Sequence, residues 1–321
     1  MTTSTPLGVT PPVAPPRRGR PRPRRSTGAL ARQQTRWGWI FAAPAVAGFV
    51  VFTVGPMIAS LVIGLTDWSI GGAPQFVGAD NYRAILDDPR FLASLKATLL
   101  YALLAVPGTV VVAFGVAALM NQVQRGRGFF RTVFYLPVLV PPVASAVLWL
   151  WLFDPTAGLL NSALRLVGLP QSQWIYGEST ALPSIALVAV WGFGNMALVF
   201  LAALQGVPRE LVEAAQMDGA GTLRRTWHIT LPQISPIILF NFVTGMIAAV
   251  QNFDSAYVIT NGGPNDATLF YVFYLYTKAF GEGQLGYASA MAWILFVVIV
   301  VVTAVLFRTA RYWVHTEGSK R

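Results

Sequence analysis

The sequence has no cysteine and very few charged residues. Of 321 residues, 11% are charged and 55% are hydrophobic, whereas a soluble domain carries about 25% charged residues. Without cysteine the chain can form neither disulfides nor thiolate metal sites. It has only two histidines, so a zinc site of the usual kind is disfavoured as well. The composition excludes an ordinary water-soluble globular protein.

Catalytic motifs are also missing. The sequence has no GxxxxGK[ST] phosphate loop, and the glycine-rich stretch at 219–226 lacks the required lysine. It has no GxSxG or HExxH motif either. We therefore predict that the chain is not an enzyme, that it binds no cofactor or metal, and that any ATP hydrolysis occurs on another subunit.

Long uncharged runs are abundant. A membrane span needs about 18 or more apolar residues, and the sequence offers six such stretches, so we predict an all-α polytopic membrane protein. The predicted spans are 39–66, 97–121, 131–153, 182–206, 234–254 and 286–308. The uncharged windows from which these spans are predicted are 37–66, 97–124, 132–153, 179–208, 226–253 and 283–307. Because they contain no acidic or basic residue, ion-coupled transport is disfavoured. His228, at the edge of the fifth stretch, is expected to be structural.

The charges divide unevenly between the two sides of these spans. The tails and the loops after spans 2 and 4 carry 18 basic and 4 acidic residues, while the other loops carry 5 basic and 9 acidic residues. By the positive-inside rule both termini are predicted to be cytoplasmic. The net charge of +10 is therefore interpreted as a topology signal rather than as a surface for nucleic acid.

Three regions follow from this pattern. Residues 1–36 are rich in proline and arginine without apolar periodicity, so we expect a disordered cytoplasmic tail. Its arginines are interpreted as topogenic, with RNA or anionic lipid as the less favoured alternative. Residues 37–310 form the predicted six-helix domain, and 311–321 a second cytoplasmic tail.

The loop at 207–232 has the pattern of two short helices joined by a turn. Pro208 suits the first turn of a helix, and Glu210 and Glu213 favour the same end. Asp218 and Gly219 predict the turn that ends this helix. A second short helix is expected through Leu223 and Trp227. The small residues at the turn would allow another protein surface to approach closely.

These residues resemble the EAA loop of permease subunits in ABC importers. The resemblance lies in EAAQMDGAGTLRRTWHITLP at 213–232, although Trp227 replaces the usual smaller aromatic residue. It implies the type I importer transmembrane fold and a loop that transmits the movement of a partner ATPase, which carries the ATP and Mg. The implied coupling residues are Glu213, Ala214, Ala215, Asp218, Gly219 and Ala220.

Segments at 76–91, 129–161 and 257–280 resemble a narrower group, the carbohydrate-type permeases. This resemblance implies a sugar importer in the prokaryotic cell membrane, with a second and different permease, cytoplasmic ATPase subunits and an extracytoplasmic binding protein. We expect polar and aromatic residues of the spans to line the sugar path: Trp191, Asn195, Asn241, Gln251, Asn252 and Asp254. Asp254 alternatively serves as an outer gate or a helix-end group.

The outer loop contains a second candidate site. We expect the binding protein to face Asn261, Gly262, Gly263 and Pro264. The alternative is an ordinary turn, because the sequence Asn-Gly-Gly-Pro favours a turn in any protein. Two alternative functions remain at this point. One is an ABC permease for a non-sugar solute, and the other is an ion-coupled carrier that acts without ATP.

Overall fold

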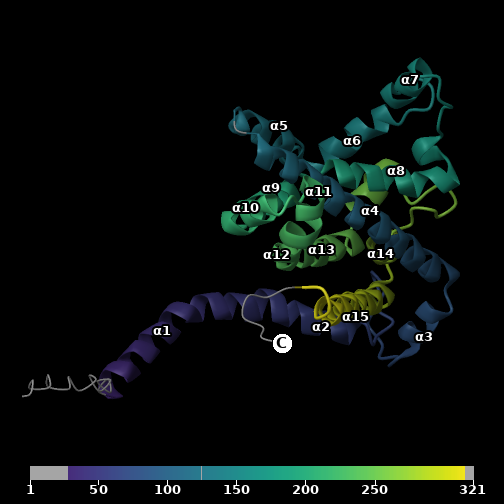
Figure 1. Cartoon of the computed structure of the whole chain (residues 1–321). Coiled ribbons are helices and arrows are strands. Elements are labelled where there is room, and N and C mark those ends of the chain that lie inside the picture. Colours follow the sequence, from purple (N-terminus) through teal and green to yellow (C-terminus); the bar gives the residue numbers. More distant parts are fainter. Residues whose placement is uncertain (1–27, 124, 315–321) are drawn as a thin grey trace, which may run out of the picture. The chain divides into compact units, whose positions relative to one another are not determined.

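The computed structural model describes residues 28–123 and 125–314, which form helices and loops without a β-strand. Two isolated bridges, Thr66 with Phe76 and Ser69 with Gln284, are the β-type pairings there. The chain divides into two compact units, Met1–Met57 and Ile58–Arg321. The all-α prediction is confirmed (Figure 1).

The first unit is helical from its first described residue. Helix α1 covers Gly28–Phe49, and a π-helical turn follows at Val50–Val54. Helix α2, Gly55–Ile63, begins in the first unit and ends in the second. The stretch Arg32–Ile63 is long and apolar enough to cross a membrane. Residues 28–36, expected in the disordered tail, therefore begin a helix, in agreement with the high helix propensity of the sequence ALARQQ at 29–34. The rest of the predicted tail, residues 1–27, lies outside the described residues, as do residues 315–321.

The second unit contains the remaining helices. Their bounds are α3 Asp80–Leu86, α4 Pro89–Gln122, α5 Arg127–Leu139, α6 Pro142–Leu152, α7 Leu159–Leu166, α8 Glu178–Trp191, α9 Gly194–Gln205, α10 Arg209–Met217, α11 Thr222–Arg225, α12 Leu231–Gln233, α13 Ser235–Val250, α14 Tyr271–Tyr276 and α15 Leu285–Ala310. Short turns of 3-10 or π helix occur at Trp174–Tyr176, Thr226–Thr230, Ala256–Thr260 and Thr277–Gly281.

Three of the predicted spans are single helices and three are bent pairs. The single helices are Arg32–Ile63, α4 and α15. The pairs α5–α6, α8–α9 and α11/α12–α13 bend by 93°, 49° and 71°, so the described residues supply up to six spans. The prolines at 137, 141 and 142 explain the first bend, because proline removes a backbone donor and disfavours helix in the residue before it. The α8–α9 bend at Gly192 and Phe193 was not predicted.

The helices extend beyond the predicted spans. Helix α4 begins at Pro89 rather than near 97, because the Asp88 carboxylate caps it by accepting a hydrogen bond from the Arg90 backbone N–H at 2.9 Å. Arg90 and Lys96 therefore lie within the helix. A charge near a helix end limits the membrane-embedded length and does not end the helix.

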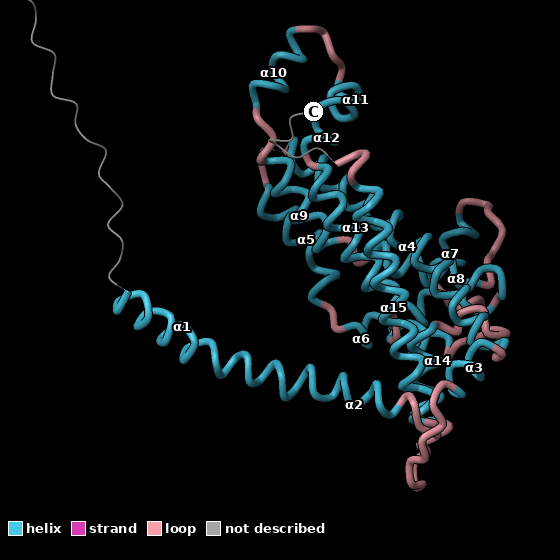
Figure 2. Tube along the Cα trace, turned by 90° about the horizontal axis from the view of Figure 1, so that it is seen from below, coloured by secondary structure: helices cyan, strands magenta, loops and turns pink. Residues whose placement is uncertain are grey.

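The core of the second unit forms around α4. This helix packs against α8, α9, α13 and α14. Several of its buried residues are alanines, among them Ala102, Ala105, Ala113 and Ala117, all 2% exposed or less. Small residues allow membrane helices to approach closely and gain packing contacts. Figure 2 shows α10–α12 at one end of this unit and α3 and α14 at the other; we name these the α10 end and the α14 end.

Candidate functional site

The loop between α9 and α13 forms the predicted pair of short helices. Pro208 is the residue just before α10, with a ψ of 126° that lies outside the helical range, so it precedes the first turn that the sequence suggested for it. Glu210 lies in that first turn, where the helix dipole favours a negative charge. The second segment, α11 followed by the π turn Thr226–Thr230 and α12, contains Leu223 and Trp227 as expected.

A Schellman motif ends α10. Gly219 N–H donates to the Gln216 carbonyl at 3.0 Å, and Ala220 N–H donates to the Ala215 carbonyl at 2.9 Å. Gly219 has a φ of +76° with no atom near the position a Cβ would take. Its conformation, rather than crowding, therefore requires glycine. Gly221, two residues on, has no positive φ and is equally uncrowded.

Large apolar side chains on this loop are exposed. Met217 is 88% exposed and Trp227 is 63% exposed, and Leu211 and Leu223 are exposed as well. No residue of α10 or α11 is buried. An exposed apolar cluster of this kind typically marks a protein–protein contact. The described chain leaves this surface open at the α10 end.

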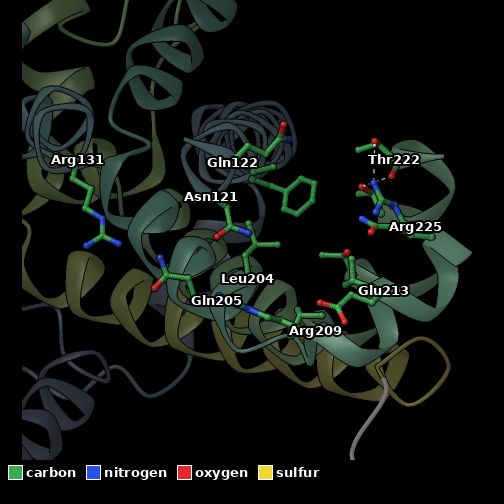
Figure 3. A pocket seen from close by; sticks show the side chains of 16 residues that line it. Asn121, Gln122, Arg131, Leu204, Gln205, Arg209, Glu213, Thr222 and Arg225 are labelled. Atoms are coloured by element: carbon green, nitrogen blue, oxygen red, sulfur yellow. Dashed lines mark hydrogen bonds between the residues drawn. The ribbon is translucent and has the colours of Figure 1, made fainter. Parts of the chain in front are cut away.

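A hollow of about 820 Å³ lies between this loop and the ends of α4, α5 and α9. Figure 3 shows Arg131 on one side of the hollow, Thr222 and Arg225 on the opposite side, and Glu213 near Arg209. The charged residues that line the hollow are Arg131, Arg209, Arg225 and Glu213. The Arg225 guanidinium donates to the Thr222 hydroxyl at 3.2 Å. Of the predicted coupling residues, Glu213 lines this hollow, and Asp218 and Gly219 are exposed at the turn.

The six predicted sugar-path residues fall into three places. Trp191 and Asn195 flank the break between α8 and α9, and the Trp191 ring meets that of Trp149 at a centroid distance of 5.8 Å. Asn241 is 2% exposed within α13, and its amide nitrogen has no partner among the described residues. Gln251, Asn252 and Asp254 follow the end of α13. None of the six lines the 820 Å³ hollow.

The predicted binding-protein segment is only partly exposed. Asn261 is exposed with a φ of 49°, whereas Gly262 is buried. A Cβ at Gly262 would lie 3.0 Å from the ring of Phe273 and 3.3 Å from the Leu269 side chain. Gly262 therefore allows the loop to pack onto the structure beneath it. The Thr268 hydroxyl fixes the same turn by donating to the Gly263 carbonyl at 2.6 Å.

A polar network at the α14 end was not predicted. The Asp88 carboxylate accepts hydrogen bonds from the hydroxyl of Tyr274, at 2.5 Å, and of Tyr287, at 2.7 Å. The Lys278 ammonium lies over both rings, at 5.4 and 5.2 Å from their centroids, and pairs with Glu282 at 2.8 Å. Partners up to 199 residues apart leave no local signal in the sequence. An acidic N-cap before Pro89 was the one visible hint.

The network changes the acidity of Asp88. Partial burial opposes ionisation of the carboxyl. Hydrogen bonds from Tyr274, Tyr287 and the Arg90 N–H outweigh it, with help from the positive charge of Lys278, and they lower the pKa of Asp88 below its ordinary value. Asp88 therefore stays ionised at neutral pH, and the carboxylate connects α4, α14 and α15.

Comparison with known proteins identifies the family. Residues 105–315 match the model for the binding-protein-dependent transport system inner membrane component family. This chain belongs to that family. It is therefore a multi-pass membrane protein and a transporter permease, in agreement with the fold and with the resemblance of the loop at 213–232.

Several relatives cover nearly the whole chain. The probable ABC transporter permease YesP of Bacillus subtilis is 40% identical over 90% of this chain and 95% of its own length. The diacetylchitobiose uptake permease NgcF of Streptomyces coelicolor is 35% identical over 95% and 90%. The sn-glycerol-3-phosphate permease UgpA of Agrobacterium fabrum is 33% identical over 86% and 95%.

A solved structure shows the same fold. A chain of a bacterial alginate ABC transporter, crystallised with its pentasaccharide-bound periplasmic protein, superposes with a TM-score of 0.76 at 22% identity. The match covers 89% of this chain and 97% of that chain. The predicted importer transmembrane fold is confirmed.

Proposed function

We propose that this permease imports a sugar or sugar-like solute as one half of a heterodimeric pore, driven by ATP hydrolysis on partner subunits. The observation that carries the proposal is the exposed helix pair at the α10 end with its apolar residues and glycine turn. The printed names of relatives, which include diacetylchitobiose and sn-glycerol-3-phosphate permeases, support a carbohydrate-type solute.

In this proposal the α10 end lies in the cytoplasm. The loops of this end contain Arg125, Arg209, Arg224 and Arg225, and basic residues near span ends favour the cytoplasmic side. Both termini are then cytoplasmic. The α14 end faces outward, where a solute-binding protein would meet the loop around Asn261.

The coupling residues are Glu213, Ala214, Ala215, Asp218, Gly219 and Ala220. Closure of the ATPase subunits would move α10 as a rigid element, because the Schellman motif fixes its end. The bends in three of the spans are positions where such a movement can change helix direction. Alternating access would follow from this rotation.

Two matched variants test the coupling role. Gly219→Val forces a branched side chain into a left-handed conformation, whereas Gly221→Val introduces the same side chain two residues on, without a positive φ. In the assembled complex, solute-stimulated ATPase activity should fall at least tenfold for Gly219→Val and much less for Gly221→Val. Equal stimulation in Gly219→Val and wild type would overturn the assignment.

Alanine substitution tests the sugar path. Trp191, Asn195, Asn241, Gln251, Asn252 and Asp254 would each be replaced in turn and solute uptake measured. At least one replacement should change the apparent affinity for the solute. Unaltered uptake in all six variants would contradict a path along these spans.

Co-purification separates the proposal from its alternatives. An ABC permease should bring down an ATPase subunit and a second permease, whereas a carrier should transport as the isolated chain. Solute screening of the complex with its binding protein distinguishes sugars from other solutes.

A further inference from the structure

A groove runs along the surface between α5 and α9. Arg131, Tyr135 and Leu139 lie four residues apart on one face of α5, and Leu198, Leu201 and Gln205 lie on the facing side of α9. The groove has a volume of about 470 Å³ and is lined mainly by apolar surface over most of its length. Arg131 and Gln205 also line the larger hollow at the α10 end, so the two spaces lie next to each other at these residues.

The polarity of the groove changes along its length. At the α10 end it begins with Arg131 and Gln205, and it ends at Leu139 and Leu198. Tyr135 lies between them, and its hydroxyl has no hydrogen-bond partner among the described residues. The helices α5 and α9 belong to bent pairs that are long and apolar enough to span a membrane. Such a span would put the apolar part of the groove at the depth of the hydrocarbon and its polar part at the membrane surface.

Arg131 has no counterion. Within the described residues no acidic side chain pairs with it, and it donates no hydrogen bond. Arg209 and Arg225 add positive charge to the adjoining hollow, against the single carboxylate of Glu213. Basic pockets between membrane helices at the cytoplasmic face suit anionic lipid headgroups. An uncompensated guanidinium prefers a bidentate phosphate partner.

We propose that this groove is a binding site for one anionic phospholipid of the leaflet at the α10 end, with its phosphate at Arg131 and an acyl chain along Tyr135, Leu139 and Leu198. A soluble anion would leave the apolar part uncovered, and a zwitterionic lipid would supply no net charge for the arginines. Under the orientation proposed above, this leaflet is the cytoplasmic one. The headgroup would lie beside Arg209 and Glu213 of α10, so lipid occupancy and the position of the coupling helix are linked.

The binding test uses the purified full chain and native mass spectrometry. Phosphatidylglycerol should be retained about tenfold or more better than phosphatidylcholine, since a charge-assisted hydrogen bond contributes at least that factor. Arg131→Gln should abolish the preference, and Arg131→Lys, which keeps the charge but loses the bidentate geometry, should restore part of it. Arg308→Gln, which removes an exposed charge from the last turn of α15, is the matched control and should behave as wild type.

Equal retention of the two lipids, or equal losses in Arg131→Gln and Arg308→Gln, would overturn the proposal. Gel filtration shows whether each variant is folded, and both arginines are exposed, so neither substitution removes a buried contact.

Two further measurements test whether the molecule bound in the groove is a lipid. Leu139→Trp fills the apolar part at an exposed position and should lower phosphatidylglycerol retention severalfold, while glycerol phosphate without acyl chains should not displace the lipid. Displacement by glycerol phosphate, together with wild-type retention in Leu139→Trp, would show a soluble phosphate site instead.

Because this chain has no cysteine, a single introduced cysteine can be labelled without removing others from it. A single Leu139→Cys variant in the assembled complex should react with a lipid-phase maleimide. If the introduced cysteine does not react with the maleimide and instead cross-links to another subunit, a protein helix occupies the groove. That result would contradict the proposal.

Discussion

Arg90, in the first turn of α4, forms a bidentate ion pair with Asp266 in the loop before α14. Its Nε and one terminal nitrogen donate to the two carboxylate oxygens at 3.0 and 2.9 Å. The Asn265 side chain reaches Glu178 at the start of α8 at 3.2 Å, and the Tyr271 N–H donates to the Thr98 hydroxyl at 2.8 Å. These contacts join the loop at 261–270 to two helices distant in sequence.

Arg90→Ala should loosen this loop without unfolding the protein. The side chains of Arg90 and Asp266 are 51% and 37% exposed. Solvent screening therefore limits the contribution of this ion pair to stability to about 1 kcal/mol or less. Hydrogen–deuterium exchange at 261–270 should increase severalfold. Arg83→Ala, which breaks the local and exposed pair with Asp80, is the control and should leave exchange in that loop unchanged; equal effects would contradict the anchoring role.

Asp88 should make stability depend on pH in the acidic range. Its pKa is depressed in the folded chain, so its contribution is present above its ordinary value of 3.8 and is lost as pH falls through the lower folded value. Thermal unfolding from pH 6 to pH 3 should show wild type more stable than Asp88→Asn near neutrality, with the difference shrinking below about pH 4. A difference that stays constant over this range would show that ionisation of Asp88 is not involved.

Asn161 should be among the most sensitive polar positions. It is 1% exposed. Its amide donates to the Pro155 and Ser172 carbonyls, both at 2.9 Å, and its oxygen accepts from the Ser172 N–H at 3.0 Å and the Trp174 indole at 2.8 Å. Asn161→Ala leaves these groups unpaired and should destabilise the protein by about 2–4 kcal/mol. Asn195→Ala, at an exposed position, should change the unfolding temperature little; similar shifts in both variants would be evidence against this assignment.

Gly194→Ala should separate α5 from α9. A Cβ there would lie 2.8 Å from both the Phe134 carbonyl oxygen and the Val138 side chain, so the helices must move apart at a cost of about 1–3 kcal/mol. Gly115→Ala in α4 meets no atom within 4 Å and should be neutral or slightly stabilising. Thermal unfolding of the two variants in the same detergent decides the point, and equal midpoints would contradict the close approach.

Local sequence patterns predicted much of the architecture. The uncharged runs located all six regions that could span, and the prolines at 137–142 indicated the sharpest bend. The loop at 207–232 was predicted as a helix, a glycine turn and a helix, because Pro208, Asp218 and Gly219 act through their own backbone conformation. The charge pattern did not predict where helices begin, such as the start of α4 at Pro89, where a cap extends the helix past charged residues.

The candidate sites were less predictable. The packing of Gly262 against Leu269 and Phe273 was not predicted, and the contact of this turn with a binding protein stays a prediction. The Asp88 network and the Arg131 groove each join residues from helices that are distant in the sequence. Neither has a sequence pattern, because the residues on each helix are unremarkable until the chain brings them together.

The sequence alone determined that the chain crosses a membrane, which loops carry the positive charge, and where a helix–turn–helix loop would lie. Hydrophobicity, charge and backbone preference act over a few residues, so they are encoded locally. Only the tertiary structure decided that Asp88 binds Tyr274 and Tyr287, that Arg90 pairs with Asp266, and that Arg131 lies unpaired beside Gln205. These relationships depend on the way in which the long helices pack together. Helix packing is set by side-chain shape across the whole bundle.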